Sequence, residues 1–264
     1  MGVRGPHPSH MRTRLLGRAP STTPPRSRSV PKRTHSASPE EIVREGWNRL
    51  STTYRPQKKK RSDFFGHRDS DYRAWLSPII EEFPFGSRVL ELGCGTGEPA
   101  GRELARRFDV TGVDISEVMI RRARANVPTG KFRRADMTRV RFPRASFAAV
   151  VSLYAMIHVP VAKQRALLTR VHSWLVPRGL FLSIVGHGAW EGTQRRWLGR
   201  KVAMFWSHAD AATFRRWLRE IGFTVLRQEY VPEGKGGHAL FLARKRVEPS
   251  PRVNPRPSRA RERR

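Results

Sequence analysis

The chain has 264 residues, of which 38% are hydrophobic, and its formal net charge is +30. The length suits one α/β domain with extensions. The single cysteine excludes a disulfide or a multi-cysteine metal site within one chain, and we predict no metal. No run of 18 apolar residues occurs, so we expect no membrane-spanning helix.

Both ends of the chain are strongly basic. Residues 1–39 contain eight Arg or Lys and no acidic residue, and residues 245–264 contain eight basic and two acidic residues. Such segments bury too little apolar surface to offset their conformational entropy, so we expect a disordered basic arm over 1–39 and a disordered basic tail over 245–264. The arm resembles an organellar transit peptide in composition. A translation start placed too far upstream, with the true start at Met11 or later, explains the composition equally well. The default prediction is a cytoplasmic protein.

The middle of the chain, residues 40–244, is also basic and carries +16 of the net charge. A positive charge of this size favours binding to an acidic partner such as nucleic acid. The basic residues are scattered over predicted helix faces and are not gathered on one of them, which is typical of a solvated surface. Binding to nucleic acid is therefore a possible but less favoured interpretation.

A helical cap is predicted over residues 40–86. A helix beginning near Glu40 has Ser38 or Ser36 as its N-cap. A basic break with one proline follows over 55–61. A second helix is predicted over 69–82, because its aromatic and aliphatic residues fall on one face.

Strands and helices then alternate. Buried strands are predicted over 87–92, 109–115, 132–136, 146–155 and 179–185, with helices over 98–107, 116–126 and 162–175 between them. An irregular aromatic segment follows over 186–209, then a helix over 210–221 with Asp210 as its N-cap, and an antiparallel strand pair over 223–231 and 238–245. This order predicts an α/β fold with a doubly wound, Rossmann-like sheet of seven strands, mostly parallel with a C-terminal antiparallel strand. The cofactor-binding core is predicted over 87–185, and the C-terminal helix and hairpin over 210–244.

A glycine-rich loop, Gly93 to Gly97 in VLELGCGTGEPA, follows the first strand. In an open parallel sheet, ligands bind outside the carboxyl ends of the strands, so this loop lies at the expected binding edge. A phosphate-binding loop needs GxxxxGK[ST], and no Lys with Ser or Thr is in register. A dinucleotide fingerprint needs Gly or Ala at the sixth position, where this chain has Glu98, so a pyrophosphate is disfavoured.

Three acidic residues accompany the loop. Asp114 ends the second strand, where a carboxylate can accept hydrogen bonds from both hydroxyls of a ribose. Glu91 precedes the loop and can face a cationic amino group, and Asp136 follows the third strand and can accept from an adenine amino group. This pattern suits a ligand with a ribose, an amino-acid end and no phosphate.

At this point the sequence resembles the class I S-adenosylmethionine-dependent methyltransferases, whose motifs match VLELGCGTGEPA, GVDIS, RADM, FAAVVSLYAMIHVP and LVPRGLFLSIV over residues 40–244. The resemblance implies S-adenosyl-L-methionine as the cofactor. It also implies that the cofactor contacts the loop, the strand ends and an N-terminal aromatic residue. The expected cofactor-binding residues are Tyr54, Glu91, Gly93, Cys94, Gly95, Gly97, Asp114, Ile115, Met119, Asp136, Met137 and Leu153.

The position of the methyl acceptor is predicted near two features. His158 follows the fourth strand and is the candidate general base, although a histidine that only caps the loop is an equal alternative. The aromatic segment 186–209 is predicted to be a substrate lid, with a satellite hydrophobic core as the alternative. The expected pocket residues are Tyr154, Trp190, Met204, Trp206 and His208.

The favoured function is an enzyme that transfers a methyl group from S-adenosylmethionine to O, N or C of a small organic acceptor. One alternative is a methyltransferase directed at nucleic acid, motivated by the basic surface and ends. Strand four lacks the Asn/Asp/Ser-Pro-Pro-aromatic signature of enzymes that methylate exocyclic base nitrogens. A non-catalytic cofactor-binding protein is the third interpretation.

Overall fold

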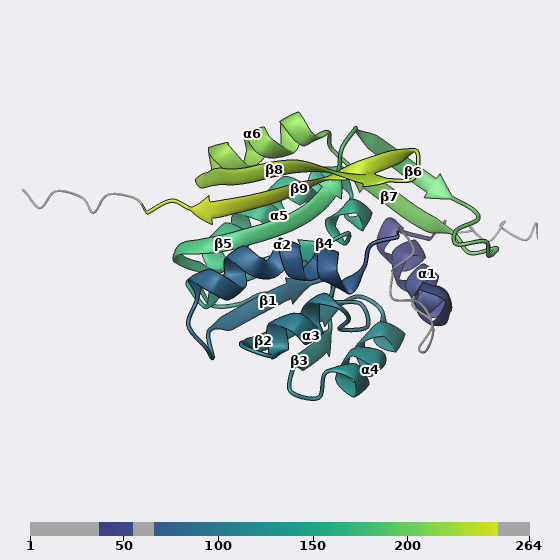
Figure 1. Cartoon of the computed structure of the whole chain (residues 1–264). Helices are drawn as coiled ribbons and strands as arrows, with labels where there is room; N and C mark the ends of the chain where they lie inside the picture. Colours follow the sequence, from purple (N-terminus) through teal and green to yellow (C-terminus); the bar gives the residue numbers. More distant parts are fainter. Residues whose placement is uncertain (1–36, 55–65, 248–264) are drawn as a thin grey trace, which may run out of the picture. The chain divides into compact units, whose positions relative to one another are not determined.

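The computed structural model describes residues 37–54 and 66–247. Almost all of the predicted basic arm and tail, and the predicted break over 55–61, lie outside the described residues. Figure 1 shows a central sheet with helices packed around it. Among the described residues, no helix is long and apolar enough to cross a membrane.

The central sheet has seven strands in the order β3-β2-β1-β4-β5-β9-β8. Their bounds are β1 Arg88–Leu92, β2 Asp109–Asp114, β3 Lys131–Arg134, β4 Phe147–Leu153, β5 Leu175–Gly186, β8 Phe223–Glu233 and β9 Gly236–Lys245. Neighbours from β3 to β5 pair in parallel, and β9 runs antiparallel to both β5 and β8. This confirms the predicted doubly wound, Rossmann-like sheet with its C-terminal antiparallel strand.

The helices are α1 Pro39–Tyr54, α2 Asp69–Glu82, α3 Ala100–Ala105, α4 Glu117–Asn126, α5 Val161–Trp174 and α6 Ala211–Ile221, with a 3-10 turn η1 at Met156–His158. Helix α4 packs near β3 at one edge of the sheet and α6 packs on β8 at the other, as Figure 1 shows. Helix α1 contacts α4 and η1, which places it beside the carboxyl ends of the strands.

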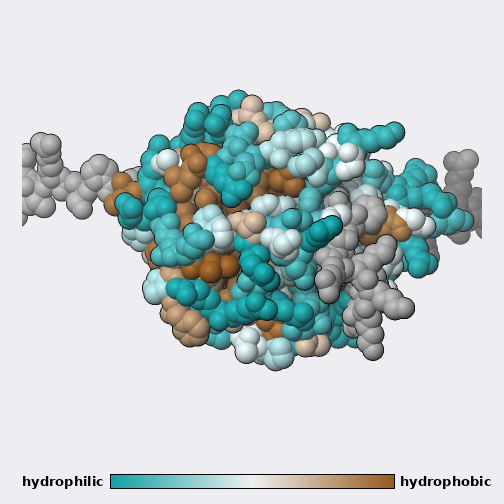
Figure 2. All heavy atoms as spheres, viewed as in Figure 1, coloured by the Kyte–Doolittle hydropathy of each residue, from teal (hydrophilic) through white to brown (hydrophobic). Residues whose placement is uncertain are grey.

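The hydrophobic core lies on both sides of the parallel strands. Val89, Leu90 and Leu92 of β1 are fully buried, and so are Val150 and Val151 of β4. Strands covered on both faces are hydrophobic along their whole length and do not alternate with polar residues. On the face drawn in Figure 2, hydrophilic residues cover most of the surface, and hydrophobic residues are visible between them.

Local capping signals agree with the structure. Ser116 accepts a hydrogen bond from the backbone N–H of Met119 at 3.1 Å and caps α4. Ser38 and Glu41 form a reciprocal capping box at the start of α1, so Ser38 is the N-cap. Asp210 caps α6, and Gly222 ends it in the left-handed conformation.

Two sequence predictions differ from the structure. The helix predicted over 98–107 covers only Ala100–Ala105, because the turns of the glycine loop extend through Pro99. The segment 186–209 is not irregular throughout, since β6 Trp190–Gln194 and β7 Met204–His208 pair as an antiparallel hairpin. Pairing satisfies the backbone polar groups of this long connection, and the four residues Met204 to Ser207 of β7 are buried.

Candidate active site

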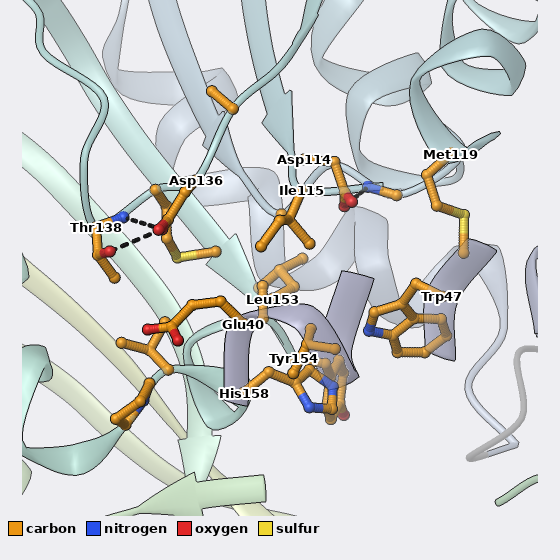
Figure 3. Close-up of a pocket in the computed structure, with 18 of the residues that line it drawn as sticks. Glu40, Trp47, Asp114, Ile115, Met119, Asp136, Thr138, Leu153, Tyr154 and His158 are labelled. Atoms are coloured by element: carbon orange, nitrogen blue, oxygen red, sulfur yellow. Dashed lines mark hydrogen bonds between the residues drawn. The ribbon is translucent and has the colours of Figure 1, made fainter. Parts of the chain in front are cut away.

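A cleft lies at the carboxyl ends of β1, β2 and β4, where the strand order reverses between β1 and β4. The cleft is open to solvent, and about 740 Å³ of space not occupied by atoms lies within its bounds. Figure 3 shows side chains from α1, the strand ends and η1 converging on it. The lining residues are Glu40, Val43, Trp47, Tyr54, Gly93, Gly95, Asp114, Ile115, Met119, Ala135, Asp136, Met137, Thr138, Leu153, Tyr154, Ala155, His158, Val159 and Pro160.

The glycine loop forms the floor of the cleft. Gly93 has φ +73°, and a Cβ there would lie 2.1 Å from the Cβ of Ala155. Gly95 has φ +51°, but a Cβ there would meet no atom within 4 Å, because this position faces open space. Glycine is therefore required at 93 by close packing of the chain after β4, and at 95 only by backbone conformation.

Asp114 holds the loop in place. Its two carboxylate oxygens accept hydrogen bonds from the backbone N–H groups of Gly95, at 3.0 Å, and Ser116, at 2.8 Å. Burial raises the pKa of Asp114 to about 6, even though these hydrogen bonds favour the carboxylate. A buried acid that also lines a cleft is suited to accept hydrogen bonds from a bound hydroxyl group.

Asp136 lies across the cleft from Asp114, after β3 (Figure 3). One of its oxygens accepts from the backbone N–H of Thr138 at 2.7 Å and from the Thr138 hydroxyl at 2.8 Å. The other oxygen lies 3.6 Å from Arg139. Thr138 thus orients the carboxylate at the edge of the cleft.

Three of the expected cofactor-binding residues do not line the cleft. Glu91 is buried behind the loop, and its Oε2 has no hydrogen-bond partner in the described residues and lies near Gly101 of α3. Burial, with the nearby charge of Asp114, raises the pKa of Glu91 to about 8. Cys94 is buried as well, and Gly97 packs against α4. These residues support the loop from behind.

Helix α1 forms a wall that the sequence analysis assigned only to Tyr54. Glu40, Val43 and Trp47 also line the cleft, and their spacing of three and four residues places them on one helix face. The rings of Trp47 and Tyr54 lie 5.0 Å apart. The helical spacing was visible in the sequence, but it did not show which element this face would meet.

His158 lies in η1 at the end of the cleft near Trp47, and its ring centroid is 5.6 Å from that of Trp47. Its Nδ1 is 2.7 Å from the backbone oxygen of Phe205. A carbonyl oxygen only accepts, so Nδ1 carries the proton and, in the neutral ring, Nε2 is an acceptor. Burial lowers the pKa of His158 to about 4, which keeps the imidazole neutral at pH 7.

Of the expected pocket residues, Tyr154 lines the cleft and the other four do not. Met204 is fully buried near Gly46 of α1, and Trp206 packs against the ring of His158 with centroids 4.5 Å apart. His208 contacts the backbone oxygen of Gly188 at 2.6 Å, and Trp190 is 45% exposed. The β6–β7 hairpin therefore supports His158 and α1 from outside the cleft.

A buried polar network behind Tyr154 was missed by the sequence analysis. The Tyr154 hydroxyl donates to Oε1 of Glu233 at 2.7 Å and lies 2.9 Å from Nε2 of His67. That same His67 nitrogen is 3.2 Å from Glu233, and Nδ1 of His238 is 2.8 Å from the other carboxylate oxygen. No local pattern could reveal this network, because Tyr154 is separated from His67 by 87 positions and from Glu233 by 79.

The residues of the cleft fit S-adenosylmethionine. Gly95 presents bare backbone to open space, acidic side chains stand at the ends of β2 and β3, and apolar side chains such as Ile115 and Leu153 lie between them. A phosphate-free nucleoside, which presents hydroxyl and amino donors, matches Asp114 and Asp136 better than an anionic pyrophosphate would. The fit thus agrees with the ligand class that the spacing of the motifs predicted.

Similar solved structures have the same fold. Magnesium protoporphyrin IX methyltransferase from Synechocystis, solved with bound S-adenosylmethionine, aligns with a TM-score of 0.62 over 80% of this chain and 99% of that one, at 19% identity. An S-adenosylmethionine-dependent methyltransferase from Mesorhizobium loti aligns with a TM-score of 0.53, over 65% of this chain and 98% of that one, at 24% identity. The chain therefore shares the fold of these two methyltransferases.

Sequence comparison identifies the family. A family model described as a methyltransferase domain matches residues 89–179. An uncharacterized methyltransferase of Mycobacterium tuberculosis is 34% identical over 153 residues, which cover 52% of this chain and 73% of that protein. The 27-O-demethylrifamycin SV methyltransferase of Amycolatopsis mediterranei is 40% identical over 82 residues, covering 28% of this chain and 30% of that enzyme. The chain belongs to the methyltransferase family.

Proposed function

We propose that this enzyme methylates O, N or C of a small organic acceptor. The observation that carries the proposal is the single cleft that joins the cofactor-type loop and strand ends to Tyr154 and His158 at its other end. When bound, the cofactor supplies an electrophilic methyl group, and the protein contributes alignment and proton handling.

The residues proposed to hold the cofactor are those that line the cleft around the loop. Asp114 would accept from the ribose hydroxyls, while Asp136 would accept from the adenine amino group. Apolar side chains would border the adenine, and Trp47 and Tyr54 of α1 would cover the site. These assignments rest on the side-chain chemistry and on the family resemblance.

His158 is proposed to contact the acceptor. Its Nδ1–H is committed to the Phe205 carbonyl, so Nε2 is the nitrogen that can accept a hydrogen bond from a donor group of the acceptor. Such a bond would orient a lone pair of the acceptor toward the methyl group. A pKa near 4 suits this orienting role better than full proton abstraction at neutral pH.

The named relatives support a small acceptor. The rifamycin enzyme and the protoporphyrin enzyme act, by their names, on discrete small molecules. The nucleic-acid alternative gains no support from these relatives. A cytoplasmic location stays a prediction.

The test is a methyl-transfer assay with fractionated acceptors. The purified full chain is incubated with S-adenosylmethionine carrying a labelled methyl group and with a bacterial extract separated into RNA, protein and small-molecule fractions. We expect label in the small-molecule fraction and only background in the other two. Label confined to RNA would replace the proposal with the nucleic-acid alternative.

A further inference from the structure

The polar network behind Tyr154 points to a proton pathway out of the cleft. Tyr154 is the member that lines the cleft, whereas the side chain of Glu233 is only 7% exposed and does not line it. Tyr154 also has φ +58°, an uncommon conformation for a non-glycine residue. Such backbone strain is kept where the surroundings require it, and it is concentrated at functional sites.

The hydrogen-bond geometry shows which group can receive a proton. A carboxylate only accepts hydrogen bonds, so the Tyr154 hydroxyl, Nε2 of His67 and Nδ1 of His238 all act as donors to Glu233. Burial opposes ionisation of Glu233, but the hydrogen bonds from these donors, together with the electrostatic attraction of His238, outweigh it and hold the pKa of the carboxyl below its usual value. Glu233 is therefore a buried anion whose hydrogen-bond partner, Tyr154, lines the cleft.

We propose that Tyr154 and Glu233 form a proton relay for the methyl acceptor, in which the phenol oxygen of Tyr154 takes the acceptor's proton as its own proton passes to the Glu233 carboxylate. The inference rests on the proposed function and deepens it. It assigns the acceptor to the class whose reacting atom must lose a proton, a hydroxyl or an N–H group. His67 and His238 are positioning residues that hold the carboxylate in line with the phenol.

The step balances in atoms and charge. The reacting atom gains the methyl group and loses its proton, and the electron pair of the broken methyl–sulfur bond stays on sulfur, which becomes neutral. Tyr154 gives one proton and receives one, so it is unchanged. Glu233 becomes a neutral acid, and one positive and one negative charge disappear together from a buried region.

A formed hydrogen bond connects Tyr154 to Glu233 as the proton store. The Tyr154 hydroxyl already donates to the Glu233 carboxylate at 2.7 Å, so its proton has a direct path. Protonation of His158 would instead create a buried cation in a position where His208 and His238 also oppose a positive charge.

Two isosteric variants test the relay. Tyr154→Phe keeps the ring and removes the hydroxyl, and Glu233→Gln keeps the shape and removes the proton-accepting carboxylate. Matched controls on β8 are Tyr230→Phe, at a 52% exposed ring, and Glu229→Gln, at an exposed partner of Arg227. The assay measures transfer from labelled S-adenosylmethionine to panels of phenols, alcohols and amines. Binding of S-adenosylhomocysteine is measured by calorimetry.

Each relay variant should lower kcat by about 10²-fold, as expected for a lost general base, with KM and cofactor affinity within about threefold of wild type. The controls should keep wild-type turnover. In mixtures of light and heavy water, the wild-type rate should give a curved proton inventory because two protons move together, and Tyr154→Phe should lose that curvature. His238→Asn, which keeps a donor near Nδ1, should retain more activity than His238→Ala.

Three results would overturn the inference. Turnover within about twofold of wild type in both relay variants would show that no proton passes this way. A loss of cofactor affinity or of folding stability in step with kcat would assign the network a structural role. Transfer by the wild type to no small molecule, in these panels or in the extract, would remove the proposed function itself.

Discussion

Exchange of Gly93 for alanine separates packing from backbone conformation in the cofactor loop. An alanine Cβ at position 93 would lie 2.1 Å from the Cβ of Ala155, far inside contact distance, at φ +73°. The left-handed conformation costs about 1–2 kcal/mol for a residue with a Cβ. Forcing an extra methyl group into a packed site adds about 1–3 kcal/mol. Gly93→Ala should therefore lower the free energy of unfolding by about 2–5 kcal/mol, the sum of these two costs.

Gly95→Ala is the matched control. Its φ of +51° carries the same backbone cost, but a Cβ there meets no atom within 4 Å. We expect a loss of only about 1–2 kcal/mol in unfolding free energy. Because this Cβ would project into the cleft, Gly95→Ala should nevertheless weaken cofactor binding.

Urea unfolding of both variants, followed by tryptophan fluorescence, gives the two free energies, and calorimetry with S-adenosylhomocysteine gives the affinities. The expected pattern is a large stability loss for Gly93→Ala and a mainly binding defect for Gly95→Ala. Equal losses of unfolding free energy in the two variants would refute the assignment of the clash with Ala155.

Three further predictions follow from the site. His158→Ala should lower turnover at least about tenfold, with cofactor affinity within a factor of about three, and unchanged turnover in the radiolabel assay would remove His158 from the mechanism. The folded protein holds a proton on Glu91 up to about pH 8, whereas the unfolded chain releases it near 4.5, so unfolding free energy should fall by about 1.4 kcal/mol per pH unit as pH rises through this interval. Urea titrations of Glu91→Gln should show a weaker decline, and an identical decline in both proteins would contradict the raised pKa. Ser38→Ala should cost about 1 kcal/mol by removing the cap of α1, measured by thermal unfolding against Ser77→Ala, which removes a hydroxyl that caps no helix.

The sequence by itself determined the features that depend on near neighbours. The alternation of strands and helices, the caps at Ser38 and Asp210, and the glycine loop all follow from patterns a few residues long. Acids at the ends of β2 and β3 were predictable because parallel strands bring their carboxyl ends to one edge.

Tertiary structure decided which of these residues face the cleft. Glu91 and Gly97 lie in the same motif as Gly95, yet the Glu91 carboxyl lies near Gly101 of α3 and Gly97 packs against Ala123 of α4. The hairpin β6–β7 was expected as a lid over the cleft, but its buried strand packs outside the cleft, against His158 and α1.

The hydrogen-bond network around Glu233 shows most clearly which features depend on near neighbours and which depend on tertiary structure. Tyr154 follows β4 and was a pocket candidate from the sequence, but its partners come from the segment before α2 and from the β8–β9 hairpin. Local patterns place a residue on an element and give its type. Only the packing of distant elements brings a carboxylate, a phenol and two imidazoles within hydrogen-bond distance, because such contacts carry no signature in the intervening chain.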